Sequence, residues 1–147
     1  MSELTHHYDE VAARLARAAA EDGRSADEVR LLAVSKTFPA EMIRELYEHG
    51  VRLFGESRAP ELAEKAAALP ADIEWHFIGR LQANKVRKVV QLAGVIHSVD
   101  TPELLTRIDR IAGEEGRRPV VLLEANVSGE ESKAGVPVGE LEAFARQ

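Results

Sequence analysis

Cysteine is absent from the 147-residue sequence. This absence excludes disulfide bonds and thiolate metal sites. No apolar run approaches the roughly 20 residues needed to cross a bilayer. The N-terminal segment, MSELTHHYDEVAARLARAAAEDGR, is amphipathic and carries acids from its start, unlike a secretory signal. We therefore expect a cytoplasmic protein without a membrane-spanning segment.

A strong excess of charge of either sign is also missing. The formal net charge is −6, with acids and bases interspersed, which disfavours a broad surface for nucleic acid or anionic lipid. His6, His7 and His49 lie in predicted helices without carboxylate or histidine partners at metal-ligand spacing, so no metal site is expected. FGES and GRLQAN match neither the dinucleotide fingerprint nor the P-loop, so a dinucleotide-binding fold gains no support.

The sequence does contain a regular alternation of short apolar strands and amphipathic helices. A helix is predicted over 3–21, within a leading segment 1–24, from the apolar positions Leu4, Tyr8, Val11, Leu15 and Ala18. Strands follow over 29–36, 51–56, 73–79, 95–100 and 119–128, and helices over 39–50, 59–69, 83–94, 101–116 and 138–147. The length suits a single domain over 1–147.

This alternation predicts an α/β fold with a parallel sheet. Polar residues gather where the predicted strands end, and in α/β folds that carboxyl edge carries the functional site. An eight-stranded barrel normally takes roughly 200–250 residues. The five predicted strand–helix units therefore fit either an open sheet or part of a barrel.

Lys36 is the sharpest feature of the predicted edge. It follows the apolar run 31–34 in LLAVSKTFP, where a strand ends. Desolvation lowers the pKa of an amine, and a neutral amine attacks carbonyl groups to form a Schiff base. From spacing alone, the simpler interpretation is a lysine that reaches solvent from a strand end.

Five stretches resemble segments of the pyridoxal-phosphate homeostasis proteins. They are AVSKTFP, FGES, WHFIGRLQANK, IHSVD and ANVSGEESKAG, in order from about residue 30 to the C-terminal end. The resemblance implies a TIM-type α/β barrel of the alanine racemase N-terminal type, of which this chain supplies about five units. It also implies pyridoxal 5′-phosphate held as a Schiff base by Lys36, and a role in vitamin B6 and amino-acid homeostasis.

Two departures from the family pattern matter. The family's FGENYVQE reads FGESRAPE here, so Ser57 replaces an asparagine that lies near the cofactor ring in relatives. Family members also continue into further strands, which carry a phosphate-holding loop and an arginine that faces the pyridine nitrogen. We interpret the chain as the N-terminal portion of such a barrel.

Three further residues are candidates for contact with the cofactor. His76 alternates with its aromatic neighbours on the third strand and points either to the cofactor or to a hydrogen-bonded core position. Glu56 ends the second strand and either orients Lys36, caps a helix or is a solvated acid. Asn126 lies in the fifth predicted strand and is expected to face the same mouth.

The resemblance predicts a carrier that holds the cofactor and passes it to amino acids or apo-enzymes. Racemases of this fold use a second base from another domain or subunit, and nothing in the sequence supplies it, so no catalytic residue is predicted. An amino-acid racemase and an inert fragment of a longer cofactor-binding protein are the alternatives. The open edges of the sheet predict self-association.

Overall fold

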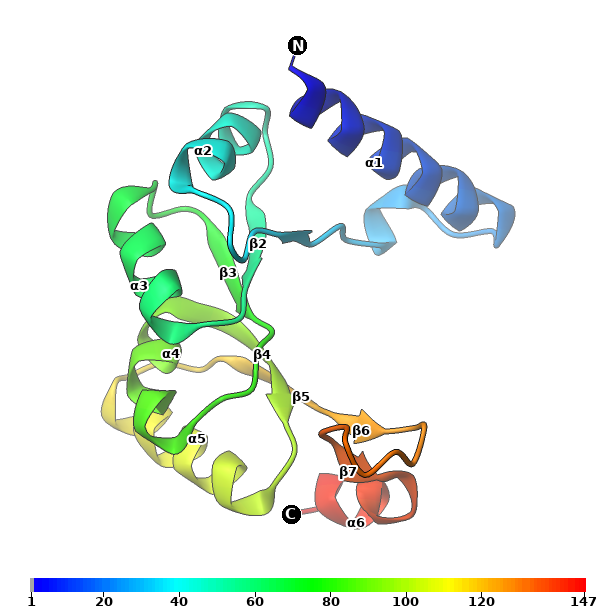
Figure 1. The fold of residues 1–147 in the computed structure, drawn as a ribbon. Helices are drawn as coiled ribbons and strands as arrows, with labels where there is room; N and C mark the ends of the chain where they lie inside the picture. The colour runs from blue at the N-terminus through cyan, green and yellow to red at the C-terminus, as the bar shows by residue number, and fades with distance from the viewer. Residues whose placement is uncertain (1) are drawn as a thin grey trace.

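The computed structural model describes residues 2–147, which form a parallel sheet with helices packed on one of its faces (Figure 1). The five strands lie side by side in chain order, and every neighbouring pair is parallel. They are β1 Ala33–Val34, β2 Leu53–Glu56, β3 Glu74–Phe77, β4 Ala93–Val99 and β5 Val120–Leu123. The predicted α/β fold is confirmed.

Helices connect the strands and cover one face of the sheet. They are α2 Ala40–Glu48, α3 Ala59–Ala68, α4 Val86–Leu92, which the short η2 Ala83–Lys85 precedes, and α5 Pro102–Glu114. Local signals place their ends. At α5, the side chain of Thr101 accepts a hydrogen bond of 3.2 Å from the N–H of Leu104, and Pro102 occupies the first turn.

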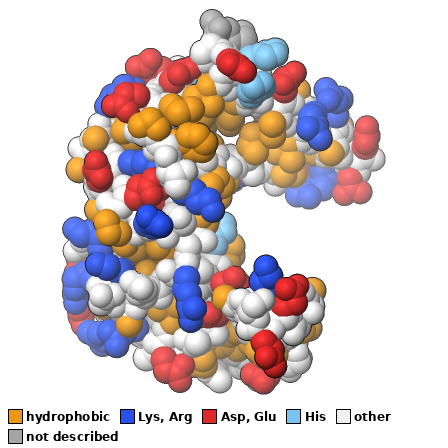
Figure 2. All heavy atoms as spheres, in the orientation of Figure 1, with side chains coloured by type: hydrophobic (Ala, Val, Ile, Leu, Met, Phe, Trp, Pro, Cys, Tyr) orange, Lys and Arg blue, Asp and Glu red, His pale blue; other side chains and the backbone are white. Residues whose placement is uncertain are grey.

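The two ends of the chain flank the opposite face of the sheet. They comprise α1 Glu3–Glu21 and η1 Ala26–Glu28 at the start, and β6 Ala125–Asn126, β7 Val136–Pro137, η3 Val138–Glu140 and α6 Leu141–Ala145 at the end. Figure 2 shows the result as a C-shaped molecule with a hollow between these flanks. We refer to this space as the hollow.

The core lies between the sheet and helices α2–α5. Phe54 and Trp75 contact each other there, with ring centroids 6.0 Å apart, and Phe77 is 2% exposed. Because side chains alternate along a strand, every second side chain points to the other face of the sheet. Helices α2–α5 do not cover that face. Val34, for example, is 48% exposed. This open face, which borders the hollow, carries Val34, Gly55, His76, Val95, His97, Val120 and Leu122.

Three predicted boundaries are wrong for reasons that lie in strand pairing. The strand predicted over 29–36 pairs only at Ala33–Val34, which lie opposite Phe54 and Gly55. The helix predicted over 83–94 stops at Leu92, since Ala93 already pairs with Trp75. The strand predicted over 119–128 breaks at Glu124, whose carbonyl accepts from the N–H of Val136 at 2.7 Å.

The N-terminal helix is confirmed over its predicted span, but only its first half packs against the core. Tyr8 is partly buried, whereas Val11 is 45% exposed. Nε2 of His49 lies 2.8 Å from Oδ1 of Asp9 and ties the end of α2 to α1. Within residues 2–147, no helix is long and apolar enough to cross a membrane, and no group of three or more His, Asp or Glu residues is placed to hold a metal.

Candidate functional site

Lys36 begins the turn that leaves the carboxyl end of β1. The N–H of Ser35 donates to the carbonyl of Gly55 at 3.0 Å, and the N–H of Phe38 donates to the carbonyl of Ser35 at 3.1 Å, which closes the turn. Ser35 is buried toward the helices, whereas Lys36 lies in the turn with its side chain exposed at the carboxyl edge of the sheet.

The backbone of the next residue is strained. Thr37 has φ of 69°, in the left-handed region, which costs a non-glycine residue roughly 1–2 kcal/mol. Its N–H donates to Oε1 of Glu61 on α3 at 2.7 Å. This charge-assisted bond holds the turn in a conformation that a β-branched residue disfavours, and it thereby fixes the direction in which Lys36 leaves β1.

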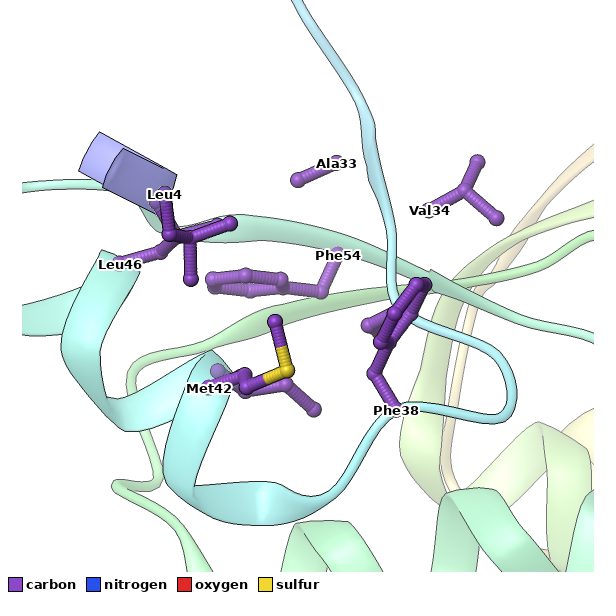
Figure 3. Close-up of a pocket in the computed structure, with 9 residues that line it drawn as sticks. Leu4, Ala33, Val34, Phe38, Met42, Leu46 and Phe54 are labelled. Carbon is purple, nitrogen blue, oxygen red and sulfur yellow. The ribbon is translucent and has the colours of Figure 1, made fainter. Parts of the chain in front are cut away.

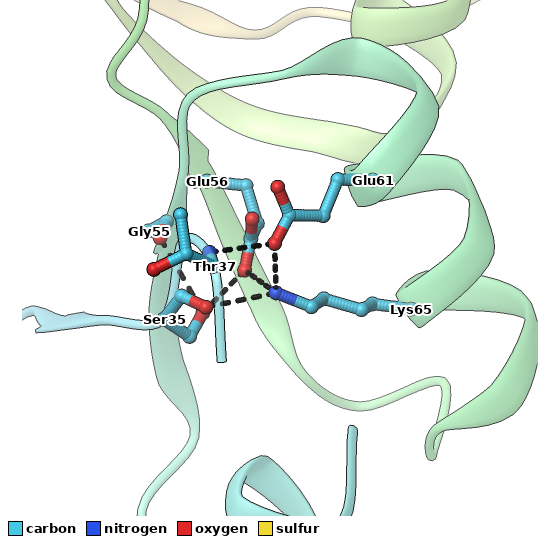
Figure 4. A network of polar contacts seen from close by, with 6 residues as sticks. All are labelled: Ser35, Thr37, Gly55, Glu56, Glu61 and Lys65. Atoms are coloured by element: carbon cyan, nitrogen blue, oxygen red, sulfur yellow. Dashed lines mark hydrogen bonds and ion pairs between the residues drawn. The ribbon is translucent and has the colours of Figure 1, made fainter. Parts of the chain in front are cut away.

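Lys65 of α3 holds the turn from the helix side of the sheet (Figure 4). Its Nζ donates to the carbonyl of Ser35 at 2.8 Å and to Oε1 of both Glu56 and Glu61 at 2.7 Å. These three bonds use all three ammonium protons, and Lys65 is only 5% exposed. The hydrogen bond from Lys65 is the main reason why the pKa of Glu61 lies below its ordinary value.

Glu56 faces α3 and not the hollow. It is fully buried, and its Oε1 also accepts from Oγ of Ser35 at 2.6 Å. Its Oε2 is buried without a hydrogen-bond partner among residues 2–147, so Lys65 supplies the charge that offsets this carboxylate. Of the three predicted alternatives, the geometry fits a residue that orients the Lys36 turn, acting through Ser35 and Lys65.

The open face brings together two histidines from neighbouring strands. Nδ1 of His76 on β3 lies 2.8 Å from Nε2 of His97 on β4, with ring centroids 5.0 Å apart. Burial, then the neighbouring ring and Arg30, lower the pKa of His76 below 6.5, while Glu74 opposes them. Burial also lowers the pKa of His97. The lowered pKa values favour neutral rings at pH above 6.5, where one ring nitrogen donates to the other.

These pKa shifts predict that stability falls as the pH drops below about 6.5, the ordinary histidine pKa. A lowered pKa in the folded state means that the unfolded chain takes up the proton first, so unfolding becomes easier. Urea unfolding at pH 7.5, 6.5 and 5.5 should show this loss, and His97→Gln should lose less. The pKa of the Glu61 carboxyl group lies below its ordinary value of 4.5, so this group does not titrate between pH 5.5 and 7.5. An equal loss in the variant would contradict the assignment.

Ser57 and Asn126, the other two predicted cofactor-binding residues, lie where strands β2 and β6 end. Ser57 directly follows β2, and its backbone packs against Gly79 at the end of β3. The side chain of Asn126 is occupied within its own loop, where Nδ2 donates to the carbonyl of Glu130 at 2.9 Å and Oδ1 accepts from the N–H of Gly129 at 3.0 Å. In this arrangement Asn126 organises the loop between β6 and β7.

An apolar cavity of about 100 Å³ lies beside the Lys36 turn, between α1, β1 and α2 (Figure 3). Figure 3 shows the side chains of Phe38, Met42 and Phe54 converging on it. Its lining is almost entirely hydrocarbon, and a charged ligand needs polar partners. This cavity is packing space under the turn and not the place for a polar cofactor.

Sequence reasoning missed Lys65 and Glu61. The available signal was their i, i+4 spacing on a predicted helix, which is typical of an exposed ion pair. Here Lys65 is buried because α3 packs over the carboxyl ends of β1 and β2, where it meets Glu56 and the carbonyl of Ser35. Only the packing of α3 on the sheet reveals this contact.

Together, the parallel sheet, the covering helices and the lysine at the end of β1 define part of an α/β barrel with an amine at its mouth. A family model described as alanine racemase, N-terminal domain, matches residues 6–147. The chain belongs to this family.

Similar proteins agree with the assignment. The pyridoxal phosphate homeostasis protein of Aquifex aeolicus is 44% identical over 124 residues, which cover 84% of this chain and 54% of that protein. The structure of PipY from Synechococcus elongatus with PLP bound is 43% identical, has a TM-score of 0.76, and is matched over 93% of this chain and 63% of PipY. The chain thus spans about half to two thirds of the length of these relatives.

A more distant likeness concerns the fold alone. Alanine racemase from Corynebacterium glutamicum is 17% identical and has a TM-score of 0.61 over 79% of this chain and 34% of the racemase. This likeness supports the interpretation of the five-stranded sheet as part of a TIM-type barrel.

Proposed function

We propose that this chain binds pyridoxal 5′-phosphate through Lys36 and serves in holding and passing on that cofactor. The observation that carries the proposal is the placement of Lys36, an exposed amine on a braced turn at the carboxyl edge of the sheet. The likeness of the chain to a protein whose structure contains PLP, and to proteins named for PLP homeostasis, supports the proposal.

The side chains around the hollow fit such a cofactor in their chemistry. When bound, the cofactor supplies an aldehyde on a phosphorylated pyridine ring. Lys36 provides the amine that would hold the aldehyde covalently, and exposed Val34 and Leu122 provide apolar surface on the open face. Glu61 and Lys65 hold the turn that contains Lys36 from the helix side of the sheet.

The proposal favours a carrier over an enzyme. The alternative is an amino-acid racemase, which has the same fold and needs a second group that exchanges the α-proton of the substrate. Among the open-face residues named above, the titratable side chains are those of His76 and His97, which are bonded to each other. Incubation with alanine and PLP in deuterium oxide separates the two functions, since only an enzyme places deuterium at the α-carbon faster than PLP does without protein.

The proposal predicts that Lys36 alone captures PLP stoichiometrically. After incubation with PLP and reduction with borohydride, the intact mass should show a single adduct, and peptide mapping should place it on Lys36. Lys36→Ala should abolish the adduct, whereas Lys88→Ala, which removes an exposed lysine of α4, should leave it unchanged. Adducts scattered over several lysines, or none, would refute a working site in this chain.

We also propose that copies of the chain associate through the open edges of the sheet. The outer edges of β1 and β5 have no neighbouring strand among residues 2–147, and Val120 on β5 is 57% exposed. Unpaired edges recruit strands from other molecules. Sedimentation velocity between about 5 and 100 μM is expected to show a concentration-dependent dimer or larger species. A monomer over the whole range would contradict the proposal.

A further inference from the structure

A second cavity lies at the carboxyl edge, away from Lys36. It has a volume of about 310 Å³ and is lined by residues that follow β2 and β3, with Lys85 of η2 on its rim. Phe77 forms part of its wall. Because Phe77 points to the helix side of the sheet, this cavity lies on the side opposite to the open face and is separate from the hollow.

The cavity collects positive charge without a carboxylate in its lining. Arg58, Arg80 and Lys85 all contribute to it. None of the three forms an ion pair or a side-chain hydrogen bond within the described part of the chain, residues 2–147. Glu61 lies within electrostatic reach of Arg58, but its Oε1 is taken by Lys65 and Thr37.

Three like charges around one small cavity repel each other, and an anion placed between them relieves that repulsion. This charge cluster is notable in a chain whose net charge is −6. The first residues of α3, Ala59 and Pro60, also line the cavity, and no side chain caps that helix. The positive end of α3 therefore adds to the same potential.

We propose that this cavity binds the phosphate group of a small phosphorylated molecule. Arginine and lysine side chains suit a phosphate because they donate charge-assisted hydrogen bonds to its oxygens. Pro60, which is exposed, offers apolar surface for an organic part beside the phosphate. The negative charge of the whole chain repels a long polyanion, so a small ligand fits better than a nucleic acid.

The proposal goes beyond cofactor binding at Lys36 and is tested independently of it. The full chain is titrated with sodium pyrophosphate at constant ionic strength, by calorimetry and by amide chemical shifts in ¹⁵N-labelled protein. Saturable binding at one site is expected. Arg58→Ala, Arg80→Ala and Lys85→Ala should each weaken it by about fivefold or more. All three side chains are at least partly exposed, so these variants are expected to fold, which thermal melting verifies.

Two controls distinguish binding in this cavity from binding elsewhere on the chain. Arg107→Ala removes an exposed cation of α5 outside the cavity and should leave the affinity unchanged. Lys36→Ala should also leave it unchanged. The proposal is overturned by the absence of saturable binding, by equal weakening in Arg107→Ala, or by loss of binding in Lys36→Ala. A single-stranded oligonucleotide that binds more tightly than pyrophosphate through the same three residues would overturn the small-ligand assignment.

Discussion

Replacing Lys65 by methionine is expected to destabilise the chain by about 3–5 kcal/mol, because it leaves a buried carboxylate without its counter-charge. Glu56 is fully buried and keeps one oxygen without a partner even when Lys65 is present. Its other oxygen would retain only the hydroxyl of Ser35. Small domains have a total stability of roughly 5–15 kcal/mol, so Lys65→Met should unfold at far lower urea concentration than the parent chain.

A double variant tests the cause of this loss. Adding Glu56→Gln removes the uncompensated charge, so Lys65→Met combined with Glu56→Gln should recover part of the stability lost by the single change. Lys88→Met, at an exposed lysine of α4, should change stability by no more than about 0.5 kcal/mol. If the double variant is as unstable as the sum of the two single variants, the buried pair is not the cause.

A role for Lys65 in positioning Lys36 requires a second measurement. At a temperature where Lys65→Met is still folded, its rate of borohydride-trapped reaction with PLP should fall well below that of the parent chain. The reason is that Lys65 donates to the carbonyl of Ser35, which precedes Lys36, and to the carboxylate of Glu61. That carboxylate in turn accepts from the N–H of Thr37, which follows Lys36. A folded variant that reacts at the parental rate would show that Lys65 serves stability alone.

Features governed by neighbouring residues could be predicted from the sequence. The first helix begins and ends at the predicted residues 3 and 21, and Thr101, a residue type that favours this position, caps α5. By contrast, the break after Leu123 depends on β7, which follows more than ten residues later and pairs with Ala125–Asn126. The apolar run 119–123 ends at Glu124, but a single polar residue does not by itself end a strand, so the tertiary pairing shows where the strand divides.

The candidate site divides in the same way. Lys36 could be placed because a strand end, a turn and a proline follow one another in the sequence. The alternation that turns His76 away from its aromatic neighbours was also predictable and is confirmed. Its contact with His97 depends on the register between β3 and β4, and the burial of Lys65 depends on how α3 packs. Both contacts join elements that are distant in the sequence, so the residue pattern of one element does not predict them.

Gly79→Ala is expected to destabilise the chain by about 3 kcal/mol, as overpacking against an immovable neighbour does. A Cβ atom at Gly79 would lie 2.0 Å from the carbonyl oxygen of Ser57, and this backbone atom cannot rotate away. The carbonyl of Gly79 also accepts from Oγ of Ser98 on β4. Adding a methyl group would therefore force apart the carboxyl ends of β2, β3 and β4, at the edge that carries both candidate sites.

A matched glycine separates this steric effect from a general effect of alanine. Gly113 lies within α5, and a Cβ atom built there meets nothing within 4 Å. Since alanine favours a helix over glycine by roughly 0.5–1 kcal/mol, Gly113→Ala should stabilise the chain while Gly79→Ala destabilises it. Urea unfolding of both variants measures the difference. Equal midpoints would mean that the chain after β2 yields to the added methyl group, and that the close approach of Ser57 and Gly79 does not hold this edge together.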